Sequence, residues 1–458
     1  MACNRNVSEN GKKRQITPFG KVAIIKSLVI SKIVNLLLNL PDPEENFLQE
    51  LEKELFNFLW GDKPSKISKF TVKKEYSEGG IRMINVRNFI TALKTSWIRK
   101  IKLNEKTCTI SEDAAPGISK IQNFGKIYSQ QLLESITNPF WKDVIKHYIK
   151  LSKKCNPTKV EEFFADHIFY NMNIKRDNNY IFIKEFSDNN IHLINHLCKD
   201  DGTFLSFNEF KNNNNWCTIN FLTYNGILNS IKDYMRSMNI NTQSPNKFVN
   251  KLSFVISKGN KFVQNYLNSD NWIPTAMKKW NNYFENLDWS KIFSNIYTTT
   301  IDTQLRWFQF RLLHRIIPTQ KYLYITKISD DPVCNLCSEE EQDICHLFFE
   351  CNVSLKFWES LQKLLKEQCI HCQNIKLDKE LIIFGYKKNF ISDKIFNFII
   401  LFAKFFLYKC KLSNSFPTIN RFKILLKNRY SLEKYTAFMQ NKEDIFSENW
   451  RLYQNLIA

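Results

Sequence analysis

The segment CNLCSEEEQDICHLFFEC, from Cys334 to Cys351, contains four cysteines and one histidine, side chains that can bind a metal ion. Cys334 and Cys337 are separated by two residues, a spacing at which two thiolates can bind one ion from a tight turn. Eight residues then precede His346 and four more precede Cys351, so the last two side chains can reach the same ion if the segment bends or begins a helix. Three thiolates and one imidazole complete the tetrahedral shell of Zn²⁺ and leave no open position, so the spacing predicts a structural zinc site.

Other interpretations of these cysteines stay open in the sequence. Cys345 neighbours His346 and could replace it or Cys351 as a ligand, although the spacing favours His346 and a small buried side chain at Cys345. The Cys-x2-Cys pair could instead be redox-active, or the cysteines could simply be buried where a loop meets a helix. We adopt the metal site, because clustered thiols in a reducing compartment indicate metal or redox chemistry.

The compartment follows from the remaining cysteines and from the chain's apolar runs. Eight of the 12 cysteines are scattered, and the N-terminal MACNRNVSENGKKRQ has no apolar region of the kind that a secretory signal requires. The most apolar run, Ile395 to Ala403, is far shorter than the ~20 residues of a membrane span. We therefore expect an intracellular protein of the cytoplasm or nucleus, neither secreted nor membrane-spanning. Cys369 and Cys372 have no partner pair nearby, so we expect no second metal site there.

Length and charge narrow the class of protein further. At 458 residues, of which 43% are apolar, the chain is long enough for two to four domains, and 11 Gly and 12 Pro favour long helices over turn-rich sheets. A net charge of +20, from 65 basic and 45 acidic residues, indicates a polyanionic partner such as nucleic acid. The alternative is coding bias, since the abundant Lys, Asn, Ile and Phe share A/T-rich codons.

The N-terminal third predicts three helices. Thr17 can cap the first, Pro18 suits its first position, and it extends to Leu40 with Lys21 and Lys32 three helical turns apart. From Gly11 to Leu40 there are six basic residues and no acidic one. EENFLQELEKELFNFLWG predicts a second helix and Ala92 to Ile101 lie in a third, with the lysine-rich KPSKISKF and a Gly-Gly break between them.

The rest of the chain predicts mainly helices as well. IFYNMNI and NYIFIKEF alternate and are expected to pair as a small β-hairpin. An apolar stripe from Leu305 to Ile316 predicts a helix that Pro318 ends, and VSLKFWESLQKLL predicts another after the metal segment. The tail from Lys394 to Arg429 carries eight basic residues and no acidic one. The expected fold class is mainly α, with a small hairpin and a Cys3His zinc knuckle between helices.

Several segments resemble the C-terminal part of the reverse transcriptases of non-LTR, or LINE-type, retrotransposons. RQITPFGKVAIIKSLVISKIVNLLLNLP, FNFLWG and GGIRMINVRNFITALKTSWIRKI are similar to the thumb and the segment beyond it in that family. LRWFQFRLLHRIIPTQKYL, the metal segment and the Phe-Trp pair at 357–358 are similar to its reverse transcriptase zinc-binding domain. The resemblance implies Cys334, Cys337, His346 and Cys351 as ligands of a structural Zn²⁺, and a thumb-like helix that grips a template–primer duplex.

The resemblance also divides the chain and exposes a gap. It implies a thumb-like helical region at 1–103, a helical connector at 104–300, the zinc-binding domain at 301–360 and a basic helical region at 361–458. A polymerase of this family needs paired aspartates that hold two Mg²⁺ ions, and FADH, ISDDP and KDDG do not supply the required hairpin. We therefore expect no catalytic residue and no enzymatic activity, with the polymerase and endonuclease cores absent from this chain or supplied elsewhere.

The function expected from these features is nucleic-acid binding, to RNA or a DNA–RNA duplex, with no small-molecule substrate and no membrane. Candidate phosphate contacts are Lys21, Lys26, Lys32, Arg311, His314 and Arg315. Trp307 and Trp358 could stack on bases, although aromatic residues at helical spacing are usually core. The alternatives are a non-functional truncated copy of a transposable element, and an adaptor or membrane-surface role for the apolar helix at Ile395 to Leu407.

Overall fold

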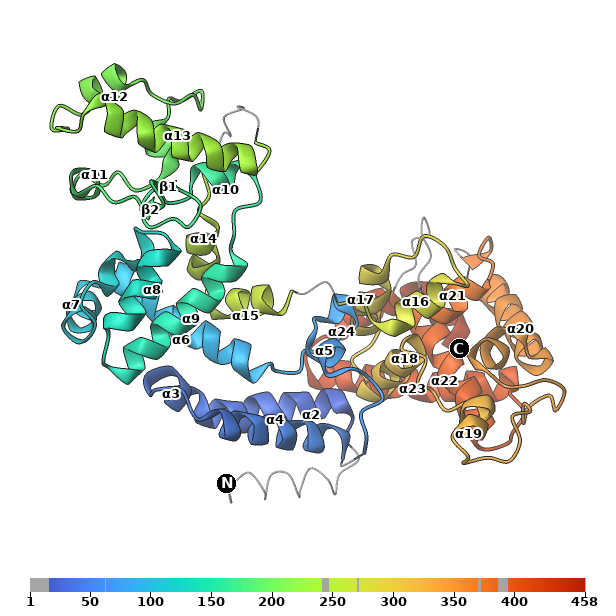
Figure 1. Cartoon of the computed structure of the whole chain (residues 1–458). Helices are drawn as coiled ribbons and strands as arrows, with labels where there is room; N and C mark the ends of the chain where they lie inside the picture. The colour runs from blue at the N-terminus through green and yellow to red at the C-terminus, as the bar shows by residue number, and fades with distance from the viewer. Residues whose placement is uncertain are drawn as a thin grey trace. The chain divides into compact units, whose positions relative to one another are not determined.

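The computed structural model describes residues 16–61, 63–240, 247–269, 272–369, 372–385 and 394–457, without the side chains of 105–108 and 110. Helices make up 66% of the chain, and the described residues form one sheet, of two strands (Figure 1). The prediction of a mainly α fold is confirmed. The protein forms two compact units: unit 1 takes in the described parts of Met1–Ile25, Leu55–Met83 and Asn271–Ala458, and unit 2 those of Lys26–Glu54 and Ile84–Asp270. Each unit joins segments distant in sequence, and the four-region division stays a prediction.

Unit 1 carries the candidate metal segment. Its helices are α2 (Pro18–Ile24), α5 (Lys69–Lys73), η2 (Tyr76–Glu78), α16 (Thr275–Asn281), α17 (Trp289–Thr299), α18 (Thr303–Leu313), α19 (Gln320–Ile325), η5 (His346–Glu350), α20 (Asn352–Gln368), α21 (Lys379–Phe384), α22 (Lys394–Leu412), α23 (Ile419–Met439), α24 (Glu443–Trp450), η7 (Arg451–Tyr453) and α25 (Gln454–Ile457). Helix α22 is central, because α17, α18, α21, α23 and α24 all pack on it.

Unit 2 is mainly helical as well. Its elements are α3 (Ser31–Asn39), α6 (Val86–Leu103), α7 (Glu105–Ala114), η3 (Ile118–Gln122), α8 (Lys126–Ser135), α9 (Pro139–Lys154), α10 (Val160–Phe164), β1 (Lys175–Arg176), β2 (Asn179–Tyr180), α11 (Lys184–Asp188), η4 (Ile194–Leu197), α12 (Phe207–Asn213), α13 (Phe221–Ser237), α14 (Lys251–Ser257) and α15 (Asn260–Asn268). Helices α6 and α9 pack along each other at its centre. Two further helices, η1 (Ile25–Ile30) and α4 (Glu45–Trp60), each contain residues of both units.

A short hairpin is present, but only its second strand lies in a predicted segment: β2 falls in NYIFIKEF, whereas β1 follows IFYNMNI. Strands β1 and β2 pair Lys175 with Tyr180 and Arg176 with Asn179. The two residues of the turn, 177 and 178, both have positive φ, as a type I′ turn requires. Ile174 and Ile181, just outside the paired residues, are buried in the hydrophobic core of unit 2 and anchor the hairpin to it.

The N-terminal helix departs from its expected regularity. It begins at Pro18 as predicted, but Thr17 makes no side-chain capping hydrogen bond. A π-helical stretch, Ile25–Ile30, separates α2 from α3. Because a π-turn is wider than an α-turn, the eleven residues from Lys21 to Lys32 no longer correspond to three α-helical turns.

One helical stretch among the described residues is long and apolar enough to cross a membrane by length and composition, Pro18–Asn39, near the N-terminus. Core helices of soluble proteins and signal sequences meet the same criterion. The run that we singled out from the sequence, Ile395 to Ala403, lies instead in α22, where both of these end residues are buried. Leu407 is buried too, whereas Phe402 and Phe405 of the same helix are half-buried.

Helix α18 ends earlier than its apolar stripe suggested. Asp302 caps it by accepting hydrogen bonds from the amides of the second and third residues that follow. It stops at Leu313 rather than running on to Pro318, because Arg315 takes a left-handed conformation, with φ of 56°. The Gly-Gly break is also tightly packed: Gly79 has φ of 80°, and a Cβ there would lie 2.8 Å from the Phe293 ring.

Candidate metal centre

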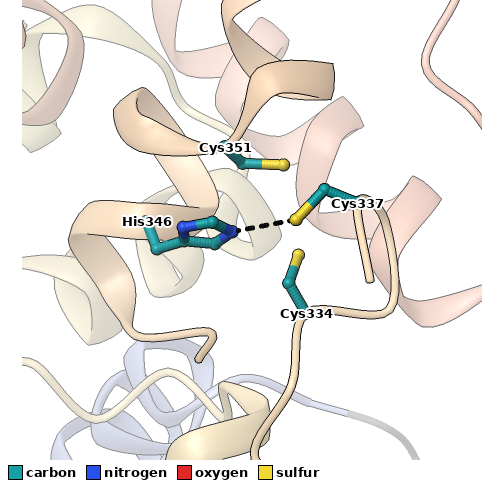
Figure 2. Close-up of side chains that lie close together, drawn as sticks. All are labelled: Cys334, Cys337, His346 and Cys351. Atoms are coloured by element: carbon teal, nitrogen blue, oxygen red, sulfur yellow. Dashed lines mark hydrogen bonds between the residues drawn. The ribbon is translucent and has the colours of Figure 1, made fainter. Parts of the chain in front are cut away.

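The four predicted ligands come together in unit 1. One donor atom from each of Cys334, Cys337, His346 and Cys351 lies within 4.8 Å of the others. Figure 2 shows the three sulfurs and the imidazole facing a common centre, with Cys337 Sγ 3.3 Å from His346 Nε2. Around a tetrahedral Zn²⁺, neighbouring donors would lie about 3.5–3.8 Å apart, given Zn–S and Zn–N bonds of roughly 2.3 and 2.0 Å. The donor set therefore fits Zn²⁺ with small shifts.

Local backbone structure brings the two halves of this set into register. The Ser338 amide donates to the Cys334 carbonyl (2.8 Å), which closes the turn that carries Cys334 and Cys337. His346 begins the π-helical turn η5, and the Cys351 amide donates to the His346 carbonyl (2.8 Å). A π-turn repeats after five residues, so the spacing of His346 and Cys351 places both on one side of it. The segment bends into a helical turn, as predicted, with π rather than α geometry.

Two side chains between the ligand pairs orient them. Glu340 Oε2 lies 3.1 Å from His346 Nδ1, and this contact directs Nε2 towards the sulfurs. The fully buried Gln342 donates from Nε2 to Cys334 Sγ at 3.1 Å. Sequence reasoning missed both residues, and the only available signal was that the polar run SEEEQD lies between the ligands.

Hydrogen bonding favours a thiolate at Cys334, although the side chain is buried. The pKa of Cys334 lies well below the usual value, because the Cys351 thiol donates a hydrogen bond to its sulfur, and the Cys337 amide and the Gln342 side chain donate as well. These hydrogen bonds outweigh burial, which by itself raises the pKa. The hydrogen bond to Cys334 and burial raise the pKa of Cys351. Cys334 and Cys351 are fully buried, His346 nearly so, and Cys337 is half-buried. Four protein donors fill a tetrahedral shell, so a bound Zn²⁺ would have no open position for substrate.

The other cysteines near this site lie outside the donor cluster. Cys345 is buried, and burial raises the pKa of its thiol to about 11. The described residues therefore favour His346 over Cys345 as the ligand. Cys369 and Cys372 are also buried, and among the described residues neither belongs to a group of metal-binding side chains.

The three lysines predicted to contact phosphate differ in exposure. Lys26 and Lys32 are exposed. Lys21 is half-buried, donates to the Leu59 carbonyl at 3.3 Å and lies 5.5 Å from the Phe58 ring centre. A phosphate at Lys21 would have to share the ammonium with these contacts.

The three basic residues at the end of α18 differ in burial. His314 is buried, its Nε2 lies 2.8 Å from the Gly79 carbonyl oxygen, and burial lowers its pKa to about 4. It belongs to the core and carries no charge for a phosphate at neutral pH. Arg311 and Arg315 are half-buried, with their guanidinium groups over the rings of Trp307 and Trp280.

The tryptophans considered for base stacking serve the core of unit 1. Trp358 is buried, and its indole N–H donates to the Phe348 carbonyl at 2.6 Å. Trp307 is half-buried and packs against Phe19, Trp60 and Phe310.

Residues 275–358 match the family model described as zinc-binding in reverse transcriptase. The match begins at α16, contains all four candidate ligands and ends in α20. It supports a protein related to reverse transcriptases that has a zinc-binding segment in unit 1. No curated protein matches the chain.

Proposed function

We propose that this chain is a nucleic-acid-binding segment of a non-LTR retrotransposon reverse transcriptase, in which Zn²⁺ is a structural ion. The observation that carries the proposal is the convergence of Cys334, Cys337, His346 and Cys351 within the region that matches the zinc-binding family model. A closed shell of four protein ligands leaves the metal no catalytic position, so its role is to hold the fold.

Binding would be electrostatic. The net charge of +20 supports contact with phosphates, and neutralised phosphates release counterions. Of the predicted contacts, Lys26 and Lys32 are the best placed, because they are exposed. Lys21, Arg311 and Arg315 are half-buried, so a phosphate would reach only the exposed part of each side chain. His314 has no place in this surface, because it is buried and neutral.

A salt titration tests the proposal. Affinity for a labelled DNA–RNA duplex should fall steeply with salt, and Lys26→Gln with Lys32→Gln should reduce the slope by about 0.9 for each phosphate that is no longer neutralised. Lys363→Gln is the matched control, since Lys363 is 79% exposed on α20 and is not a predicted contact. Absence of binding at low salt, or equal slopes for the two lysines' double variant and the control, would refute the proposal.

We further propose that the chain makes no phosphodiester bond by itself. Primer extension on an RNA template with Mg²⁺ and nucleotides should give no product. Template-dependent extension by the purified chain would overturn this part of the proposal and leave the binding function intact.

A further inference from the structure

The lysine-rich segment after α4 presents an ordered aromatic pair to solvent. Phe70 in α5 is 62% exposed and Trp272 is 45% exposed. Their ring centres lie 5.5 Å apart with an interplanar angle of 32°. The Trp272 indole N–H donates to Thr71 Oγ1 at 3.0 Å, so this ring is held at the surface by a directed bond. Exposing two adjacent aromatic rings to water costs free energy, and adjacent exposed apolar side chains of this kind indicate a binding surface.

The segment that carries Phe70 is rich in lysine. The sequence from Lys63 to Lys74 contains five lysines and no acidic residue. Lys66 and Lys69 are exposed, and their ammonium groups lie 4.9 Å from the ring centres of Tyr322 and Phe56 respectively. These cation–π contacts keep the lysine stems against the protein, on the same short segment as Phe70.

The metal centre supports one edge of this surface. Tyr322, under Lys66, belongs to α19, and the Lys321 amide of the same helix donates to the Gln342 carbonyl at 3.1 Å. The Gln342 side chain in turn donates to Cys334 Sγ. The segment that holds the metal therefore also positions the ring on which Lys66 rests.

We infer that Phe70 and Trp272, with Lys66 and Lys69, form a stacking platform for single-stranded nucleic acid. Bases stack on exposed aromatic rings while lysines neutralise the adjacent phosphates, a combination that is tolerant of sequence. A duplex hides its base faces in its own stack, so the platform selects unpaired nucleotides. Lysine is depleted at protein–protein interfaces, which argues against a protein as the occupant. The inference rests on the proposed nucleic-acid function and specifies where, and in which form, the strand binds.

Fluorescence anisotropy of the full chain tests the platform. The probes are a labelled oligouridine of about 20 nucleotides, long enough for a single-strand site, and a DNA–RNA duplex of the same length. Phe70→Ala should weaken oligouridine binding by about five- to hundredfold and leave duplex binding within about twofold. Lys66→Gln with Lys69→Gln should lower the salt slope for oligouridine by about 0.7 for each phosphate that is no longer neutralised. Phe416→Ala is the matched control, because Phe416 is 69% exposed and lies outside the platform.

The outcomes separate this inference from the proposed function. If the unmodified chain binds neither probe, the nucleic-acid function fails and the platform with it. If it binds both probes and Phe70→Ala binds oligouridine as tightly as Phe416→Ala does, the platform alone is refuted. Trp272→Phe is a second variant that controls for unfolding, since it keeps an aromatic ring but loses the hydrogen bond to Thr71. Its affinity for oligouridine should lie between those of the unmodified chain and Phe70→Ala, and its circular dichroism spectrum should be unchanged.

Discussion

Removing the metal should destabilise unit 1 and leave unit 2 folded. The four donors lie within 4.8 Å of one another, and the residues just beyond His346, Leu347 and Phe348, are fully buried. Without the ion, this cluster would keep three sulfurs and an imidazole close together with no cation to bind. The turn at Cys334 would then lose its connection to η5 and to the start of α20.

The size of the effect follows from binding linkage. With free Zn²⁺ at about 1,000 times its dissociation constant, the ion adds about 4 kcal/mol to the free energy of unfolding. In a cooperative unit of about 150–250 residues, 1 kcal/mol moves the melting temperature by about 2–4 °C. Chelation should therefore lower the melting temperature of unit 1 by roughly 8–16 °C.

Two measurements check this prediction. Differential scanning calorimetry with and without a strong chelator gives the shift, and hydrogen exchange locates it, with faster exchange expected in η5 and α20 and unchanged exchange in α9 of unit 2. Cys337→Ser should abolish most of the chelator effect, since it removes a half-buried ligand at little cost in packing. Cys345→Ser is the control, because this buried cysteine lies outside the donor cluster and should keep the full shift. A chain purified without zinc, whose melting is indifferent to chelator, would refute the reasoning.

Three further substitutions test individual contacts. Glu340→Gln should weaken zinc affinity by about 10–100-fold in a competition titration with a chelator, because the carboxylate orients His346; an unchanged affinity would contradict that role. His314→Gln should flatten the pH dependence of stability. In the unmodified chain the unfolded histidine binds its proton near pH 6.5 and the folded one near pH 4, so the free energy of unfolding should fall by up to about 3 kcal/mol as the pH drops through this window. Urea titrations at both pH values measure this fall, and an equal fall in the variant would contradict the role of His314. Gln309→Leu should lower the free energy of unfolding by about 1–3 kcal/mol, because it removes the acceptor 2.7 Å from Nζ of the fully buried Lys404. Adding Lys404→Met should recover most of that loss, and a double variant no more stable than Gln309→Leu would exclude this pairing.

The sequence by itself determined features that depend on neighbouring residues. Spacing alone brought out Cys334, Cys337, His346 and Cys351, because a turn and a helical turn fix the positions of side chains a few residues apart. Helical periodicity and the scarcity of Gly and Pro were enough to predict the mainly α class, and Pro18 marked the start of α2.

Only the tertiary structure decided which charged and aromatic side chains face water. The sequence offered His314 as a phosphate contact and left Trp358 open between base stacking and the core, but both are buried. His314 is covered by parts distant along the chain, since it contacts the Gly79 carbonyl and the Phe293 ring. Phe70 and Trp272 became a pair only when unit 1 folded, since 201 residues lie between them in the sequence. The physical reason is that local spacing is set by covalent geometry, whereas burial depends on which distant element covers a residue, and the hydrophobic effect that drives this burial has no direction along the sequence.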